Sequence, residues 1–90
     1  MNVTKSAMSI TPAQCRAARG LLNWSQDELA EATNGEVAKR SLVRFEKGDT
    51  APQPRTLIAI RTAMEAAGVE FIPENGGGAG VRLRKADEGR

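Results

Sequence analysis

The spacing of hydrophobic residues changes once along this chain, and the change separates a helical part from a short β part. Up to Gly68 apolar residues recur mainly every three or four positions, which is typical of helices that bury one face. Beyond Gly68 apolar and other residues alternate in the segments 69–72 and 81–84, and a period of two is typical of strands. The pattern therefore predicts a mainly α fold of four helices that ends in a two-stranded β segment.

Two capping boxes mark where the first two helices begin. Thr11 and Gln14 are three residues apart, and the proline between them favours a first helical turn. Ser25 and Glu28 repeat this spacing. The first helix is predicted to end near Leu22, with Cys15, Ala18 and Leu22 facing inward. The second helix is predicted to run from Gln26 to about Thr33.

Two further helices are bounded by glycine and proline. Asn34-Gly35 breaks the second helix, and Gly48 ends the third in a left-handed conformation. Pro54 opens the fourth helix, since proline suits the first helical position, and Gly68 closes it. These helices are predicted to span roughly Val37 to Lys47 and Pro54 to Ala67, with Val37, Leu42, Phe45, Leu57, Ile60 and Met64 inward.

The strands are separated by the glycine-rich stretch 73–80, which predicts a loose hairpin. We therefore divide the chain into four parts. Residues 1–9 are expected to form a flexible tail and residues 10–68 the helical domain. Residues 69–85 are expected to form the β segment, and residues 86–90 a frayed end.

Positive charge is concentrated on the third predicted helix. The 90-residue chain, long enough for one domain, carries a net charge of only +2. Segment 37–47 holds four bases and one acid, a local charge of +3, whereas segment 69–90 holds four of each. A short cationic helix packed against another helix is typical of DNA-reading elements. The basic residues therefore lie where affinity for phosphates needs them.

The composition disfavours catalysis and metal binding. The chain has no His and one cysteine, Cys15, so it lacks the commonest general base, an internal disulfide and a zinc ligand set. No signal peptide is visible, and the apolar runs are far shorter than the ~20 residues of a membrane span. We expect a cytoplasmic, nucleoid-associated protein that is no enzyme and has no cofactor.

Eight positions in the second and third predicted helices form a joint pattern: Gln26, Leu29, Ala30, Val37, Leu42, Phe45, Glu46 and Gly48. The pattern resembles the Cro/repressor helix-turn-helix domain, the XRE-like regulators of bacteria and phages. The resemblance covers about Thr11 to Gly68 and implies a lambda-repressor-like fold. The tail 68–78 is similar to a subgroup common in alphaproteobacteria, in which a short hairpin follows the helices.

The resemblance implies a sequence-specific transcriptional regulator that binds double-stranded DNA with its third helix in the major groove. The Arg fork matches the two acceptors of guanine, and Lys suits the same edge or a phosphate. The expected base-contacting residues are Lys39, Arg40 and Arg44. The expected phosphate-contacting residues are Gln26, Ser41, Lys47 and Arg55, and a structural ion pair is expected between Arg19 and Glu46.

The chain departs from the family in the turn between the second and third helices. About six residues usually separate the positions of Leu29 and Val37, and here the separation is eight. Ala38 also replaces the usual Ser or Thr cap. Either the turn bulges outward, or the third helix begins one turn early, near Gly35.

We expect a homodimer on a palindromic operator, joined at least in part by an apolar face of the C-terminal strands, Val69, Phe71, Val81 and Leu83. The alternative is a hairpin that folds back onto its own fourth helix. The same domain also suits an antitoxin, which binds a toxin protein as well as its operator. A third possibility is a protein-interaction module that binds no DNA.

Several other residues permit two interpretations. Trp24 suits a hydrophobic staple better than a stacking platform, and Cys15 suits the core better than a redox sensor. The glycine run 76–80 lacks the Gly-Lys-Ser/Thr of a phosphate loop. The basic residues of segment 82–85 either touch the DNA backbone or keep an edge strand soluble.

Overall fold

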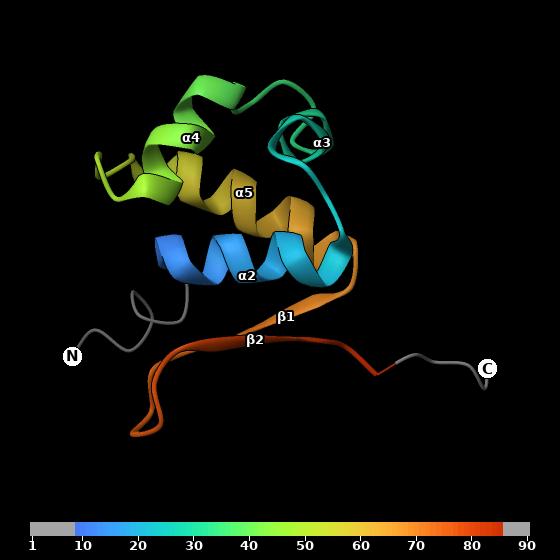
Figure 1. Cartoon of the computed structure of the whole chain (residues 1–90), viewed down its shortest axis with the longest axis vertical. Coiled ribbons are helices and arrows are strands. Elements are labelled where there is room, and N and C mark those ends of the chain that lie inside the picture. The colour runs from blue at the N-terminus through green and yellow to red at the C-terminus, as the bar shows by residue number, and fades with distance from the viewer. Residues whose placement is uncertain (1–8, 86–90) are drawn as a thin grey trace.

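A computed structural model describes residues 9–85, so the tails expected over residues 1–9 and 86–90 lie, apart from Ser9, outside the described part. The elements are labelled as in Figure 1. They are α2 (Pro12–Leu22), α3 (Gln26–Ala32), α4 (Lys39–Lys47), α5 (Pro54–Ala66), β1 (Val69–Ile72) and β2 (Gly80–Leu83). Four helices followed by a two-stranded antiparallel hairpin confirm the predicted fold class.

The local signals placed the starts of α2, α3 and α5 correctly. The Thr11 and Ser25 side chains each accept a hydrogen bond from the backbone N–H three residues on, and both capping boxes are complete. Gly48 ends α4 with φ of +83°, a left-handed conformation that favours glycine. The helix ends differ slightly from prediction, since α3 stops at Ala32 and α5 at Ala66.

The molecule has three layers in Figure 1. The α3–α4 pair lies on one side of α2 and α5, and the hairpin lies on the other side, beneath α2. The apolar core lies between these layers, and its fully covered large side chains include Leu29, Leu42, Ile60, Met64 and Val69. Trp24 packs against this core, as do Leu22 and Leu57, which were expected inside and are only half-buried. No helix within residues 9–85 is both long and apolar enough to cross a membrane.

The hairpin is fixed to α2 by a buried glutamine. β1 and β2 pair with Val69 opposite Leu83 and Phe71 opposite Val81. The side-chain nitrogen of Gln14 donates to the backbone oxygens of Ile72 (3.2 Å) and Gly80 (2.9 Å). The loop end of the hairpin is therefore held against the helical layer.

Candidate nucleic-acid interface

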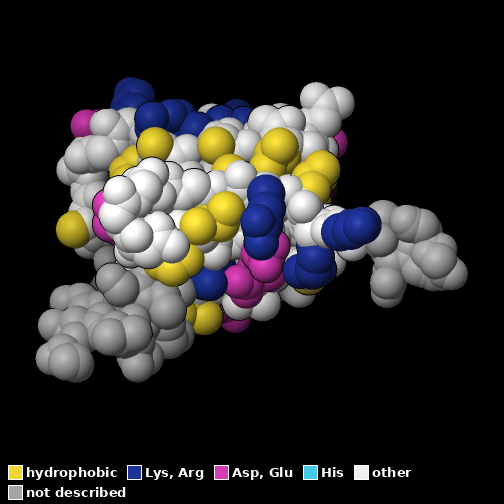
Figure 2. Space-filling model, turned by 90° about the horizontal axis from the view of Figure 1, so that it is seen from below, with side chains coloured by type: hydrophobic (Ala, Val, Ile, Leu, Met, Phe, Trp, Pro, Cys, Tyr) yellow, Lys and Arg dark blue, Asp and Glu magenta, His cyan; other side chains and the backbone are white. Residues whose placement is uncertain are grey.

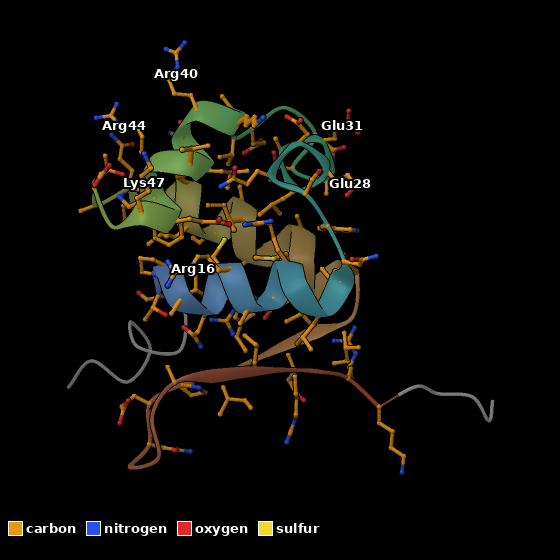
Figure 3. The ribbon with its side chains drawn as sticks, in the orientation of Figure 1. Arg16, Glu28, Glu31, Arg40, Arg44 and Lys47 are labelled. Carbon is orange, nitrogen blue, oxygen red and sulfur yellow. The ribbon has the colours of Figure 1, made fainter. Side chains whose placement is uncertain are left out.

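The outer side of α4 carries a row of exposed polar and basic side chains. Figure 3 shows Arg40, Arg44 and Lys47 projecting away from α2 and the core. Lys39 and Ser41 are exposed as well, and Lys39 pairs with Asp27 of α3 at 3.4 Å between Nζ and a carboxylate oxygen. Both partners of that pair are more than half exposed, so it leaves Lys39 able to exchange partners.

The inner side of α4 holds the helix against the core. Leu42 is completely covered and Phe45 is 3% exposed, three residues further on. Spacing by three residues puts both side chains on one face, so the basic residues between and beyond them are turned outward. The packing of α4 therefore sets the direction of its basic row.

The inner side also carries Glu46, a charged residue that is only 3% exposed. Its carboxylate receives two hydrogen bonds from Arg19, from Nε at 2.8 Å and from Nη2 at 2.7 Å. The Gln26 amide nitrogen donates to it at 3.0 Å, and the Cys15 thiol at 3.2 Å. Arg16 donates to the backbone oxygen of the same residue. Side chains of α2 and α3 thus converge on the end of α4.

These contacts change the acidity of both buried groups. Burial by itself would raise the pKa of Glu46, but the hydrogen bonds from Arg19, Cys15 and Gln26 and the charge of Arg19 hold that pKa below its usual range. Burial, with the adjacent carboxylate, raises the pKa of the Cys15 thiol. Cys15 therefore stays a neutral donor inside the core, in line with the core interpretation.

The lengthened turn before α4 is built around Thr33. Asn34 (φ 58°) and Gly35 (φ 84°) reverse the chain in left-handed conformations. The Thr33 hydroxyl donates to Ala30 O at 2.7 Å and accepts from Val37 N–H at 3.1 Å. The two extra residues thus lengthen the turn, and α4 begins at Lys39 rather than at Val37 or near Gly35.

Thr33→Val is expected to cost about 1–3 kcal/mol of unfolding free energy, because it leaves the buried Val37 N–H without an acceptor. Thr33→Ser keeps the hydroxyl and is the matched control, expected to retain most of the stability. Urea unfolding of both variants measures the difference. A Thr33→Val variant that unfolds at the same urea concentration as the parent would show that the hydrogen bond contributes nothing to stability.

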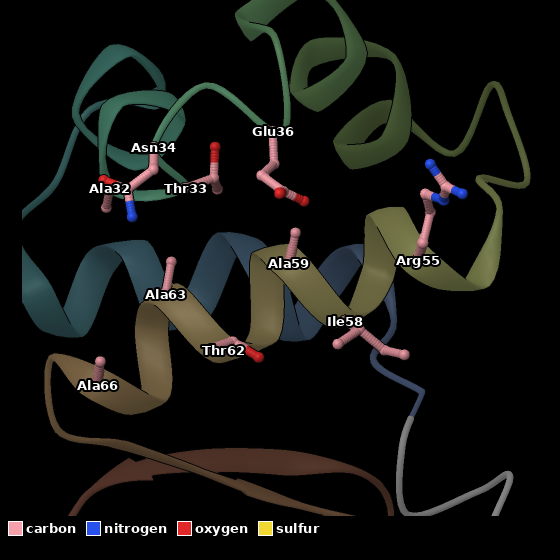
Figure 4. Close-up of a pocket in the computed structure, with 10 residues that line it drawn as sticks. All are labelled: Ala32, Thr33, Asn34, Glu36, Arg55, Ile58, Ala59, Thr62, Ala63 and Ala66. Atoms are coloured by element: carbon pink, nitrogen blue, oxygen red, sulfur yellow. The ribbon is translucent and has the colours of Figure 1, made fainter.

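The expected phosphate-contacting residues do not all lie on one surface. Ser41 shares a small pocket with Arg44, of about 220 Å³, between α4 and the following loop. Arg55 instead lines a groove of about 520 Å³ that the end of α3, the turn and α5 enclose (Figure 4). Gln26 is half-buried and uses its amide on Glu46. Lys47 is exposed at the end of α4.

The residues expected to form an apolar dimer face are also divided. Val69 is completely covered and Phe71 is 7% exposed, because β1 packs against α2 and α5 of the same chain. Val81 is half-buried, and Leu83 is 48% exposed. The apolar face that was expected on both strands is therefore buried on β1 and exposed only in part on β2.

Sequence reasoning missed that Cys15 and Arg16 donate hydrogen bonds to Glu46 and that Gln26 is turned inward. The available signal was the spacing of Cys15 and Arg19, which are four residues apart and therefore share a face of α2. That face meets Glu46 in the structure.

Two short helices joined by a turn, with basic residues outward on the second, define a helix-turn-helix DNA-binding domain. The family model HTH_3, described as Helix-turn-helix, matches residues 16–66, more than half of the chain. The chain belongs to this helix-turn-helix family, whose XRE-type members are DNA-binding transcription regulators. A search of curated proteins found no match.

Proposed function

We propose that this protein is a sequence-specific regulator that inserts α4 into the major groove of double-stranded DNA. The observation that carries the proposal is the exposed row of Arg40, Arg44 and Lys47 on the side of α4 opposite its buried residues. A major groove about 12 Å wide admits a helix, and guanine offers two acceptors there to an Arg fork. The family match supports the class of function.

The side chains of α4 divide into two proposed roles. Lys39, Arg40 and Arg44 contact base edges, and Ser41 and Lys47 contact phosphates. Phosphate contacts fix the position of the helix without reading sequence, whereas base contacts discriminate. Gln26 and Arg55 are proposed to add phosphate contacts at the edge of the interface. For Gln26 this requires the second hydrogen of an amide nitrogen that already donates to Glu46.

We further propose that the protein acts as a homodimer on a palindromic operator. One helix reads too few base pairs for useful selectivity, whereas two helices about 34 Å apart read both half-sites. A place in the alphaproteobacterial subgroup with a C-terminal hairpin and a cytoplasmic, nucleoid-associated location stay predictions of the sequence. So does the antitoxin alternative, which adds a toxin partner to the same operator binding.

Selection from a random duplex library tests the function directly. The full chain, incubated with the library at physiological salt and excess non-specific DNA, is expected to enrich one palindromic site. Binding that site with a specificity ratio of about 10³ or more would support the proposal. Failure to enrich any sequence, or binding that salt does not weaken, would support the protein-interaction module instead.

Lys47→Ala is expected to weaken binding to the selected site and to unrelated duplexes by the same factor. It removes one proposed phosphate contact from each half-site, so the steepness of log affinity against log salt should fall by about 2 for the dimer. Lys85→Ala is the matched control, because it removes one exposed positive charge from the strand layer, away from α4. Fluorescence anisotropy over a salt series measures both. A loss confined to the selected site would make Lys47 a base-reading residue.

A further inference from the structure

The outer edge of β2 has backbone N–H and C=O groups that pair with no other strand within residues 9–85. Arg84 N–H donates to Gly68 O at 2.7 Å in the register of the hairpin, which makes them a hydrogen-bonded pair. Such pairs alternate with pairs whose N–H and C=O groups point away from each other. The alternation turns the backbone groups of Val81 and Leu83 away from β1. No third strand covers them within residues 9–85.

Exposed apolar surface lies beside this edge. Leu83 is 48% exposed and Leu21 of α2 is 41% exposed. α2 and β2 run in the same direction (Figure 1), and the contact of Gln14 with Gly80 aligns their beginnings. Seven helical residues and three strand residues both advance about 10 Å, which brings Leu21 toward Leu83. Figure 2 views the molecule from the hairpin side and shows hydrophobic side chains in a row beside charged ones.

The edge of β1 differs from the edge of β2. Its outward-turned residues, Val69 and Phe71, have buried side chains, and the guanidinium of Arg61 lies 5.5 Å from the centre of the Phe71 ring. Their apolar surface is already covered by the helices of the same chain. Only β2 combines open backbone groups with exposed apolar side chains.

We infer that this β2 edge, defined by Val81, Leu83 and Leu21, binds a second copy of the chain by antiparallel pairing of the two β2 strands. An antiparallel pair of identical strands has a two-fold axis, so each copy offers the other the same surface. The pairing extends the sheet to four strands and gives partners to the outward backbone groups of β2. The inference deepens the proposed function, because it locates the dimer contact.

Edge pairing also suits DNA binding. It keeps the helical layers of both copies on one face of the joined sheet, and α4 lies on the far side of α2 from the hairpin (Figure 1). Both α4 helices therefore face the same way, as two half-sites on one duplex require. Stacking the open sheet faces would turn the helices apart and would bury the exposed Glu70–Arg82 pair.

Charge selects the register of the pairing. Only registers that place outward-turned residues opposite each other form hydrogen bonds. A pairing centred on Arg82 puts two Arg82 side chains directly opposite, and one centred on Leu83 puts Arg82 opposite Arg84, which like charge disfavours. A pairing centred on Val81 puts Arg82 opposite Gly80 of the second copy. The geometry therefore points to Val81 on the two-fold axis.

Sedimentation equilibrium of the full chain without DNA tests the surface. The parent protein is expected to be a dimer at tens of micromolar. Leu83→Glu and Val81→Pro should each raise the dimer dissociation constant at least about tenfold. Proline removes only an outward N–H and is tolerated on edge strands. Ile58→Glu is the matched control, because Ile58 is similarly exposed, at 42%, and lies on α5 in the separate groove. Circular dichroism confirms that each variant is folded.

A monomeric parent protein, or folded β2 variants that dimerise like the parent, would overturn the inference. Dissociation by Ile58→Glu alone would move the interface to the α5 groove. A cysteine series then tests the register, since the native Cys15 is buried. Val81→Cys should oxidise to a covalent dimer, because paired residues on the axis lie about 5.5 Å apart. Cross-linking of Arg82→Cys instead would overturn the register. Neither assay uses DNA, so failure here is distinct from failure of the proposed DNA binding.

Discussion

Glu46→Ala is expected to lower the free energy of unfolding by about 3–5 kcal/mol, the cost of leaving a shielded charge without its partner. The substitution leaves the Arg19 guanidinium without the carboxylate to which it makes two hydrogen bonds. It also removes the acceptor for Gln26 and Cys15. Chemical denaturation measures the loss directly.

Two comparisons separate burial from charge pairing. Glu70→Ala breaks an ion pair of the same 2.7 Å length between exposed groups, and no resolvable change in stability is expected. Replacing Arg19 and Glu46 together with methionine should cost less than Glu46→Ala, because no unpaired charge remains. A melting temperature unchanged in Glu46→Ala would show that the network contributes nothing.

The same network predicts a pH dependence. The pKa of Glu46 is lower in the folded protein than its ordinary value of 4.5. Its ionised form is therefore the one that folding stabilises. That contribution is complete above pH 4.5 and is lost as the pH falls through the folded value. Glu46→Gln should flatten the acid limb of a plot of stability against pH, and an unchanged limb would assign the effect to other carboxylates.

The double change Arg40→Ala, Arg44→Ala is expected to abolish selective DNA binding while leaving the fold intact. Each Arg that contacts a base edge contributes about 1–3 kcal/mol of discrimination. Both side chains are exposed and project away from the core, so their removal leaves the packing of Leu42 and Phe45 unchanged. Anisotropy with the selected site and with a scrambled duplex measures the ratio of the two affinities.

The single variants refine this result. Arg40→Ala and Arg44→Ala should each relax the preference at one base pair of each half-site in a repeated library selection. Lys85→Ala again controls for lost charge. Selective binding that survives the double change, with affinity close to that of the parent, would remove α4 from the interface.

Local signals in the sequence predicted the elements well because those signals act within one turn. Thr11 and Ser25 cap helices through residues only three positions away, and Gly48 acts through its own backbone. The period of two after Gly68 likewise depended only on neighbouring residues. The start of α4 was harder to predict, because it depends on the hydrogen bond between the Thr33 hydroxyl and Val37 N–H across a turn longer than usual.

The site was harder to predict because it depends on contacts between distant segments. Gln26 and Glu46 are twenty residues apart, and nothing near either residue indicates that the amide turns inward. Val69 and Phe71 gave a correct strand pattern, but the pattern does not say which layer covers the apolar face. The structure shows that α2 and α5 of the same chain cover it.

Methylation interference on the selected operator tests most directly whether α4 reads the major groove. Dimethyl sulfate methylates guanine N7 in the major groove and adenine N3 in the minor groove, so one treated duplex reports on both. DNA bound by the full chain is expected to be depleted of methylated guanines at symmetric positions in the two half-sites, where an Arg fork needs N7 free. Interference at adenine N3 with none at guanine N7 would show that α4 does not read the major groove.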